Sequence, residues 1–193
     1  MDFSYRGQQV FAAFNFSSTS KVVGLSGPPG CGKTTLLKLL AGQLRPTRAI
    51  KLDVPESPVI ILQEDALLPW LTGWQNLELT GSQSPSVKSH PLFGVVEHLL
   101  TKRAHAMSFG QRRTVELFRA FVFNPALLCL DEPFNFIDSA TRIQFLNYIN
   151  VRAFPGQLIM STHHVDELAT VQAEAFRFSG RLPVNALERC PNE

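Results

Sequence analysis

The 193-residue sequence lacks any run of 18 apolar residues, the length that a helix needs to cross a bilayer. It also lacks a basic start followed by an apolar stretch, so we do not expect a secretory signal. Cysteine is scarce, and Cys31, Cys129 and Cys190 are scattered and odd in number, which argues against a disulfide framework and favours a reducing compartment. Any task at a membrane would therefore need a partner that supplies the spanning part.

The sequence also lacks a large excess of charge of one sign, because the net charge is only +2 and the basic residues form no long run. Nucleic acid is therefore not an expected partner. The five histidines show no metal-ligand spacing. With 45% hydrophobic and 18% charged residues, the chain can bury a good core and is not of the disordered class. Its length fits one domain with at most a small subdomain.

Short apolar runs alternate with helical patterns along the chain. The patterns predict strands over 10–16, 21–25, 58–62, 126–130 and 158–161, helices over 34–44, 92–103 and 110–123, and a loop over 81–91. Strands that alternate with helices predict an α/β fold with a mostly parallel sheet, covered by helices on both faces.

The segment Gly-Pro-Pro-Gly-Cys-Gly-Lys-Thr at 27–34 lies between a predicted strand and a predicted helix. It matches the phosphate-loop pattern G-x-x-x-x-G-K-[ST], in which backbone amides and the helix N-terminus attract phosphate. Lys33 can reach the β- and γ-phosphates, and the Thr34 hydroxyl can bind Mg²⁺. The alternative is a glycine-rich turn, but a chance match is only about one in a hundred. The predicted nucleotide contacts are Gly27, Pro28, Pro29, Gly30, Cys31, Gly32, Lys33, Thr34 and Thr35.

Two acids, Asp131 and Glu132, follow the apolar strand at 126–130. This order places a carboxylate at the carboxyl edge of the sheet, beside the phosphate loop. Asp131 is predicted to hold Mg²⁺, through water, and Glu132 to polarise the attacking water. The alternative is an acid pair that caps a following helix. The phosphate loop earlier in the chain favours the metal-binding and catalytic interpretation over this one.

A third segment, Met-Ser-Phe-Gly-Gln at 107–111, is followed by Arg112 and Arg113 and lies a short way before the acidic strand. It resembles the signature of the ATP-binding-cassette (ABC) family, which usually reads Leu-Ser-Gly-Gly-Gln. Phe109 takes the place of the first signature glycine, so a bulky side chain stands where backbone would approach phosphate. The departure bears on the rate of turnover rather than on nucleotide binding.

Other residues stand, in order, where this family has functional positions. Gln63 matches the Q-loop glutamine, Asp138 the D-loop aspartate, His163 the switch histidine, and Tyr5 the aromatic residue that stacks on adenine. Each alone has a plainer interpretation, such as a strand-end amide, a helix cap or a packing aromatic. Their order and spacing favour the family.

The resemblance implies a P-loop NTPase (RecA-like) fold with a small antiparallel β part at the N-terminus and a reduced α-helical subdomain. Residues 1–63 and 111–193 are expected to form the nucleotide-binding core, and 64–110 the helical subdomain with the signature at its end. Such an arrangement predicts a pared-down member of the family without a C-terminal regulatory domain.

The resemblance also implies ATP hydrolysis between two copies of the chain that face head to tail. Glu132 and His163 are the implied catalytic residues, and Thr34, Gln63 and Asp131 the implied Mg²⁺ ligands. Further nucleotide contacts are implied for Tyr5, Gln63, Ser108, Gly110, Gln111 and Asp138.

The segments at 63–72 and 162–168 resemble the energising subunits of nitrate, sulfonate and taurine importers. This implies a cytoplasmic protein held at the inner face of the cell membrane by transmembrane permease subunits. The apolar residues Leu67, Leu68, Trp70, Leu71 and Trp74 either offer a groove to a permease helix or fill the core of the helical subdomain. The alternatives are a soluble non-transport cassette ATPase, a P-loop kinase, and a degenerate cassette that binds ATP with little hydrolysis.

Cysteine chemistry gives one further expectation. Cys31 lies in the phosphate loop close to Lys33 and a helix N-terminus, which favour a thiolate, so we expect an exposed and reactive thiol. The alternative is a small residue that is tolerated at a variable position and points away from the nucleotide. Cys129 lies in an apolar strand and is expected to be inert.

Overall fold

The computed structural model describes residues 1–48, 53–81, 87–151 and 153–190. Its main element is a six-stranded sheet with the strand order β4-β5-β6-β3-β7-β8. The strands are β3 (Val22–Ser26), β4 (Val59–Ile61), β5 (Leu127–Asp131), β6 (Gln157–Ser161), β7 (Glu174–Arg177) and β8 (Glu188–Arg189). All neighbours pair in parallel except β8, which runs antiparallel to β7, so the sheet is mostly parallel as predicted.

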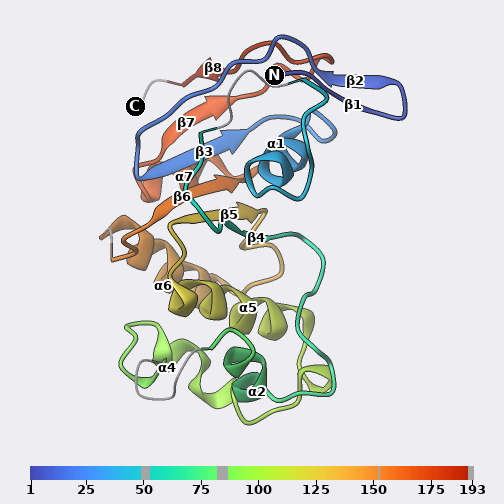
Figure 1. Ribbon diagram of the computed structural model, residues 1–193. Helices are drawn as coiled ribbons and strands as arrows, with labels where there is room; N and C mark the ends of the chain where they lie inside the picture. The colour runs from blue at the N-terminus through green and yellow to red at the C-terminus, as the bar shows by residue number, and fades with distance from the viewer. Residues whose placement is uncertain (49–52, 82–86, 152, 191–193) are drawn as a thin grey trace.

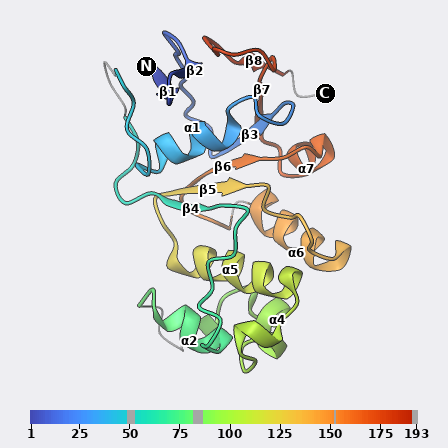
Figure 2. The ribbon, with the colours of Figure 1, turned by 90° about the vertical axis from the view of Figure 1, so that its right-hand side faces the viewer.

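Helices cover both faces of this sheet (Figure 2). Strand β5 shows how: Leu128 and Leu130 face one core, with the side chains of α5 (Phe109–Phe123) and α6 (Ser139–Asn150), whereas Leu127 and Cys129 face the other core, with α1 (Lys33–Leu40). Because both faces are buried, the strand is apolar at successive positions rather than alternating. This continuous apolar pattern is what identified β5 and β6 in the sequence.

The N-terminal part is a separate two-stranded antiparallel sheet of β1 (Phe3–Tyr5) and β2 (Gln8–Phe11). The turn that joins the strands has positive φ at Arg6 (41°) and Gly7 (92°), the backbone twist that a two-residue hairpin favours. The hairpin lies beyond α1, at the end of the molecule opposite to α2 and α4 (Figure 1). The small antiparallel part predicted at the N-terminus is therefore present.

Between β4 and α5 the described residues form only short helices: α2 (Gly73–Glu78), α4 (Phe93–Val96) and the 3₁₀ turns η1 (Glu97–Leu99) and η2 (Ala104–Ala106). They pack beneath α5 (Figures 1 and 2), and their buried side chains join the core on that face of the sheet. The exact limits of a helical subdomain at 64–110 stay a prediction.

Several predicted boundaries are wrong. The helix expected over 34–44 ends at Leu40, and the strand expected over 10–16 is β2, which ends at Phe11. The helix expected over 92–103 is only α4 and η1, because the carbonyls of Leu100 and Lys102 turn away to accept hydrogen bonds from the first amides of α2. No local pattern announces that contact.

The loop expected over 81–91 falls in part on 82–86, outside the described residues. Within the remainder, Val87 and Lys88 are helical and Val87 is fully buried, so that part of the loop prediction is wrong. In α7 (Val165–Thr170) and α6 the chain also forms helices that the sequence patterns did not indicate. Among the described residues, no helix is both long and apolar enough to cross a membrane.

Candidate functional site

The phosphate loop connects β3 to α1 and owes its shape to three glycines with positive φ: Gly27 (138°), Gly30 (74°) and Gly32 (107°). A side chain at Gly27 would meet Phe178 at 2.9 Å, so this position excludes larger residues as well. No side chain caps the N-terminus of α1. Its first amides are therefore left for a ligand, and the positive end of the helix favours an anion there.

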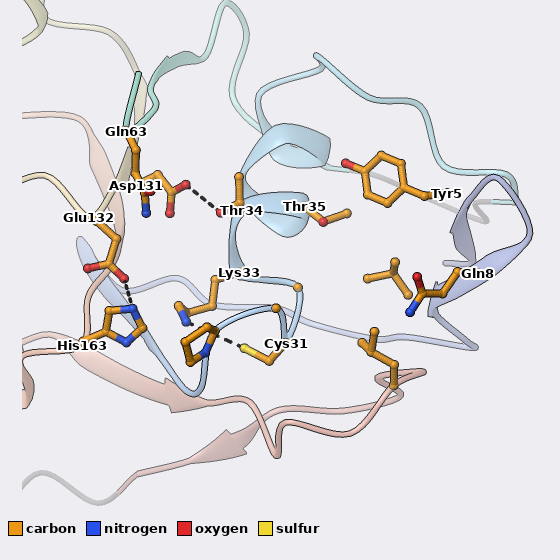
Figure 3. A pocket seen from close by; sticks show the side chains of 15 residues that line it. Tyr5, Gln8, Cys31, Lys33, Thr34, Thr35, Gln63, Asp131, Glu132 and His163 are labelled. Carbon is orange, nitrogen blue, oxygen red and sulfur yellow. Dashed lines mark hydrogen bonds and ion pairs between the residues drawn. The ribbon is translucent and has the colours of Figure 1, made fainter. Parts of the chain in front are cut away.

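Above this loop lies a cavity of about 680 Å³, within the range of small-molecule sites. It is bordered by segments that follow β4, β5 and β6 at the carboxyl edge of the sheet, where open α/β sheets bind ligands. The lining residues are Tyr5, Gln8, Val10, Pro29, Gly30, Cys31, Gly32, Lys33, Thr34, Thr35, Gln63, Asp131, Glu132, His163 and Leu182. Figure 3 shows Tyr5 and Gln8 at one end, Glu132 and His163 at the other, and Lys33 and Thr34 between them.

Two side chains of the loop are engaged within the protein. The Lys33 ammonium donates hydrogen bonds to the carbonyls of Gly27 (2.7 Å) and Pro28 (3.1 Å). The Thr34 hydroxyl donates to Asp131 Oδ2 (2.7 Å). A hydroxyl beside a buried carboxylate at the phosphate end of the cavity is a pair of oxygen ligands of the kind that Mg²⁺ prefers.

The second acid, Glu132, lies at the far end of the cavity in contact with His163. Glu132 Oε1 is 2.8 Å from His163 Nε2 (Figure 3). The glutamate side chain is almost fully buried, whereas the histidine side chain is about half exposed. Glu132 also has a left-handed backbone, with φ at 49°. The carboxylate is therefore buried next to a ring that solvent can reach.

Most of the predicted site residues are brought together here. Gln63 lines this cavity and also a small hollow beside Glu132 and Phe109. Tyr5 lies on the opposite rim and is 42% exposed, so its ring is accessible to a ligand. Gly27 and Pro28 belong to the loop but do not line the cavity.

The remaining four predicted residues, Ser108, Gly110, Gln111 and Asp138, do not line this cavity. Ser108 Oγ accepts from the Gln111 amide (3.2 Å), and Gln111 Oε1 accepts from the Ser108 amide (3.1 Å), which caps α5. Asp138 Oδ1 accepts from the Thr141 amide (3.0 Å) and caps α6, and these bonds lower the pKa of Asp138. Within one chain, Ser108, Gln111 and Asp138 are helix caps.

The Cys31 prediction is wrong with respect to exposure. The thiol lines the cavity wall but is only 1% exposed, since it packs into the core between α1 and the N-terminal hairpin. Cys129 agrees with its prediction, because burial raises the pKa of its thiol to about 12. The apolar cluster near Gln63 divides: Leu67 is buried in the core, whereas Trp70 is 63% exposed.

Sequence reasoning missed Gln8, Val10 and Leu182 at the rim near Tyr5. For Gln8 a signal was available. It faces Tyr5 across the two-residue turn of the hairpin, and cross-strand partners project to the same side. Leu182 comes from a distant segment after β7 and carries no such signal.

Residues 14–135 match a family model described as ABC transporter. Aliphatic sulfonates import ATP-binding protein SsuB 2 of Paraburkholderia xenovorans is 40% identical over 156 residues, which are 77% of this chain and 62% of that protein. The SsuB protein of Granulibacter bethesdensis, named in the same way, is 37% identical over 151 residues, with 75% of this chain and 63% of the relative covered. The chain thus spans less than two thirds of the length of these relatives.

Solved structures share the fold at low sequence identity. The ATP-binding subunit of an ABC transporter superposes with a TM-score of 0.80 at 21% identity, covering 97% of this chain and 87% of that one. A dimeric ATP-binding cassette in a post-hydrolysis state with ADP and phosphate superposes with a TM-score of 0.71 at 19% identity, covering 97% and 93%. At these identities the likeness concerns the fold.

Proposed function

The chain belongs to the ABC transporter family, and on that premise we propose that it binds and hydrolyses ATP as the energising subunit of a small-solute importer. The observation that carries the proposal is the meeting of Lys33, Thr34, Asp131, Glu132 and His163 at one cavity. Phosphate-binding, metal-binding and proton-accepting groups are all needed for ATP hydrolysis, and a phosphate site alone would need only the first.

The order of the residues along the cavity suits a nucleotide with its adenine at Tyr5 and its phosphates at the loop (Figure 3). Lys33 would exchange the carbonyls of Gly27 and Pro28 for oxygens of the β- and γ-phosphates. The amides at the start of α1 would bind the same phosphates, together with Thr35. Cys31 contributes a wall of the cavity rather than a reacting group.

The residues at the phosphate end fit Mg²⁺. Thr34 and Asp131 are in contact there, and Gln63 offers an amide oxygen nearby. Among the described residues, no group of three or more His, Cys, Asp or Glu side chains is placed to bind a metal ion. Mg²⁺ in nucleotide sites is usually bound by one or two carboxylates together with the phosphates of the substrate. When bound, Mg²⁺ would neutralise charge that develops on the phosphates.

For hydrolysis, a water oxygen attacks the γ-phosphorus while the bond to the β–γ bridging oxygen breaks, giving ADP and phosphate. Glu132 accepts the proton of the attacking water. His163 holds the Glu132 carboxylate through their 2.8 Å contact, and its exposed ring can also reach the γ-phosphate. The left-handed backbone at Glu132 keeps this carboxylate directed into the cavity.

Ser108, Gly110, Gln111 and Asp138 do not line the nucleotide cavity of their own chain. Their position supports a head-to-tail pair of chains in which they serve the nucleotide of the second copy. Ser108 and the first amides of α5, at a helix N-terminus, suit a γ-phosphate presented from outside. In this proposal 1–63 and 111–193 act as the core, and 64–110 as the subdomain that moves on closure.

The importer assignment draws on the relatives, which are named as import ATP-binding proteins for aliphatic sulfonates. The exposed Trp70, a few residues after Gln63, supports contact with a permease subunit, which would hold the chain at the cytoplasmic face of the membrane. No observation favours a non-transport cassette or a degenerate one, since Lys33, Glu132 and His163 are all present.

The change Glu132→Gln tests the chemistry. An amide fills the same space but accepts no proton, so the rate of ATP hydrolysis should fall about 10²–10⁴-fold while equilibrium ATP binding is retained. Glu97→Gln, at an exposed carboxylate in η1, is the matched control and should keep the parental rate. Hydrolysis at the parental rate in Glu132→Gln would remove Glu132 as the base.

A further inference from the structure

Glu132 is the one proposed catalytic side chain that stands on a left-handed backbone, with φ at 49°. Residues other than glycine avoid this region, because the Cβ atom crowds the following carbonyl. Such a conformation persists where surrounding contacts over-determine it. The contacts of the backbone on either side of Glu132 therefore show what holds the carboxylate in place.

On the amide side, Ser161 at the end of β6 holds the backbone. The Glu132 amide donates to the Ser161 carbonyl (3.2 Å) and to the Ser161 hydroxyl (3.1 Å). The same hydroxyl donates to Asp131 Oδ1 (2.5 Å). Ser161 thus fixes the start of the strained turn.

On the carbonyl side, one guanidinium holds both neighbours of Glu132. Arg113 in α5 donates from Nη2 to the Asp131 carbonyl (3.0 Å) and from Nε to the Pro133 carbonyl (3.1 Å). The side chain is 3% exposed, so these bonds form away from solvent. The carbonyl before Glu132 and the carbonyl after it are therefore bound to the same rigid group.

The third nitrogen of Arg113 reaches the other side of the site. Nη1 donates to the carbonyl of Leu62, the residue before Gln63, and to Glu116 Oε2 (3.0 Å). Glu116 in turn accepts through Oε1 from the Ala66 amide (3.1 Å). The buried charge of Arg113 is thus paired, and the segment that carries Gln63 is tied to the segment that carries Glu132.

We propose that Arg113 is a positioning residue for hydrolysis, which holds Glu132 and Gln63 in register without contacting the nucleotide. It borders the small hollow between these two residues but does not line the nucleotide cavity. The planar guanidinium suits this role, because it offers donors in fixed directions to separate carbonyls, whereas a lysine has a single nitrogen. The inference rests on the proposed function, in which Glu132 is the base.

The test compares Arg113→Lys with Arg119→Lys in the full chain. Arg113→Lys keeps a positive charge opposite Glu116 but releases the carbonyls around Glu132, so kcat should fall about a hundredfold, as for a small misplacement of a catalytic group. KM and the Kd for ATP–Mg²⁺ should stay within about threefold, since Arg113 does not border the nucleotide cavity. Arg119 lies on the same helix and, among the described residues, donates to the Ala66 carbonyl at 3.4 Å, so its variant should behave as the parent.

Combination with Glu132→Gln separates positioning from loss of structure. If Arg113 acts through Glu132, the double variant should have the residual rate of Glu132→Gln alone. A double variant whose rate falls by the product of the two single-variant effects would overturn the proposal. An unchanged kcat in Arg113→Lys would overturn it as well. If Arg113→Lys does not fold, Arg113→Gln/Glu116→Gln removes both buried charges and should show the same loss of kcat at unchanged Kd. A parental rate in Glu132→Gln itself would instead remove Glu132 as the base, the part of the proposed function on which this inference rests.

Discussion

Among single residues, Gly110 is required by a contact inside the chain. A Cβ atom at this position would lie 2.2 Å from the carbonyl oxygen of Phe136. Phe136 has a left-handed backbone (φ 67°), is 77% exposed, and packs edge-on against Phe109. The glycine therefore lets α5 approach the segment between Glu132 and Asp138. This role is separate from its proposed contact with the nucleotide of a second chain.

The change Gly110→Ala should destabilise the fold, because backbone rather than a flexible side chain meets the new methyl group. We expect the free energy of unfolding in urea to fall by about 1–3 kcal/mol, the usual cost of overpacking. The matched control is Gly94→Ala in α4, where no atom lies within 4 Å, and which should be neutral or stabilising. Equal stability of Gly110→Ala and the parent would show that the Phe136 segment yields freely.

Between elements, His90 joins the helical layer to α5 and α6. Its Nδ1 accepts a hydrogen bond from the Leu92 amide (3.2 Å), its Nε2 contacts the Tyr148 hydroxyl (3.2 Å), and its ring packs edge-on against Phe118. The amide donor at Nδ1 requires the tautomer with the proton on Nε2. Burial lowers the pKa of His90 below its ordinary value of 6.5.

A lowered pKa in the folded state makes stability depend on pH in one direction. His90 contributes its full stabilisation above the unfolded pKa of about 6.5, and this is lost as pH falls toward the lower pKa of the folded state. The free energy of unfolding should therefore decrease as the pH falls below about 6.5. His90→Gln, which does not titrate, should flatten this decrease relative to the parent, and His98→Gln, at an exposed site in η1, should not. A decrease of the same size in His90→Gln would assign the effect to other groups.

At the scale of the whole molecule, one chain holds only part of the proposed nucleotide contacts. The chain should therefore be monomeric without nucleotide, and Glu132→Gln should form a dimer in ATP–Mg²⁺, measured by light scattering. Adding Ser108→Asp should prevent this dimer, because a carboxylate repels the γ-phosphate while still capping α5. Ser108→Ala should instead lower stability by about 1 kcal/mol through loss of the cap.

Two outcomes would contradict the shared site. Persistent monomer in saturating ATP–Mg²⁺ would show that the nucleotide does not bridge two chains. An undiminished dimer with Ser108→Asp, at unchanged stability, would show that the N-terminus of α5 does not face phosphate. Light scattering and urea unfolding on the same samples separate these results.

The sequence by itself determined the elements whose physics is local. The phosphate loop needs only its own glycines, Lys33 and Thr34 between a strand and a helix, so its shape follows from contiguous residues. Asp131 and Glu132 end an apolar strand, and parallel strands bring their carboxyl ends to one edge. Helix α5 begins and ends as predicted to within one residue, because Ser108 and Gln111 form its cap within one turn.

Tertiary structure decided what depends on residues far apart in the chain. The predicted helix over 92–103 breaks because Leu100 and Lys102 serve the start of α2. Leu182 lines the cavity beside the hairpin because its neighbour Val184 exchanges backbone hydrogen bonds with Val10 and Ala12. Arg113 binds three backbone carbonyls in two segments that are far apart in the chain. Every residue type carries a backbone carbonyl, so the sequence does not mark which ones are bound. Such contacts are stabilised by packing between distant parts of the chain and not by local sequence preference. They can therefore be recognised only in the folded structure.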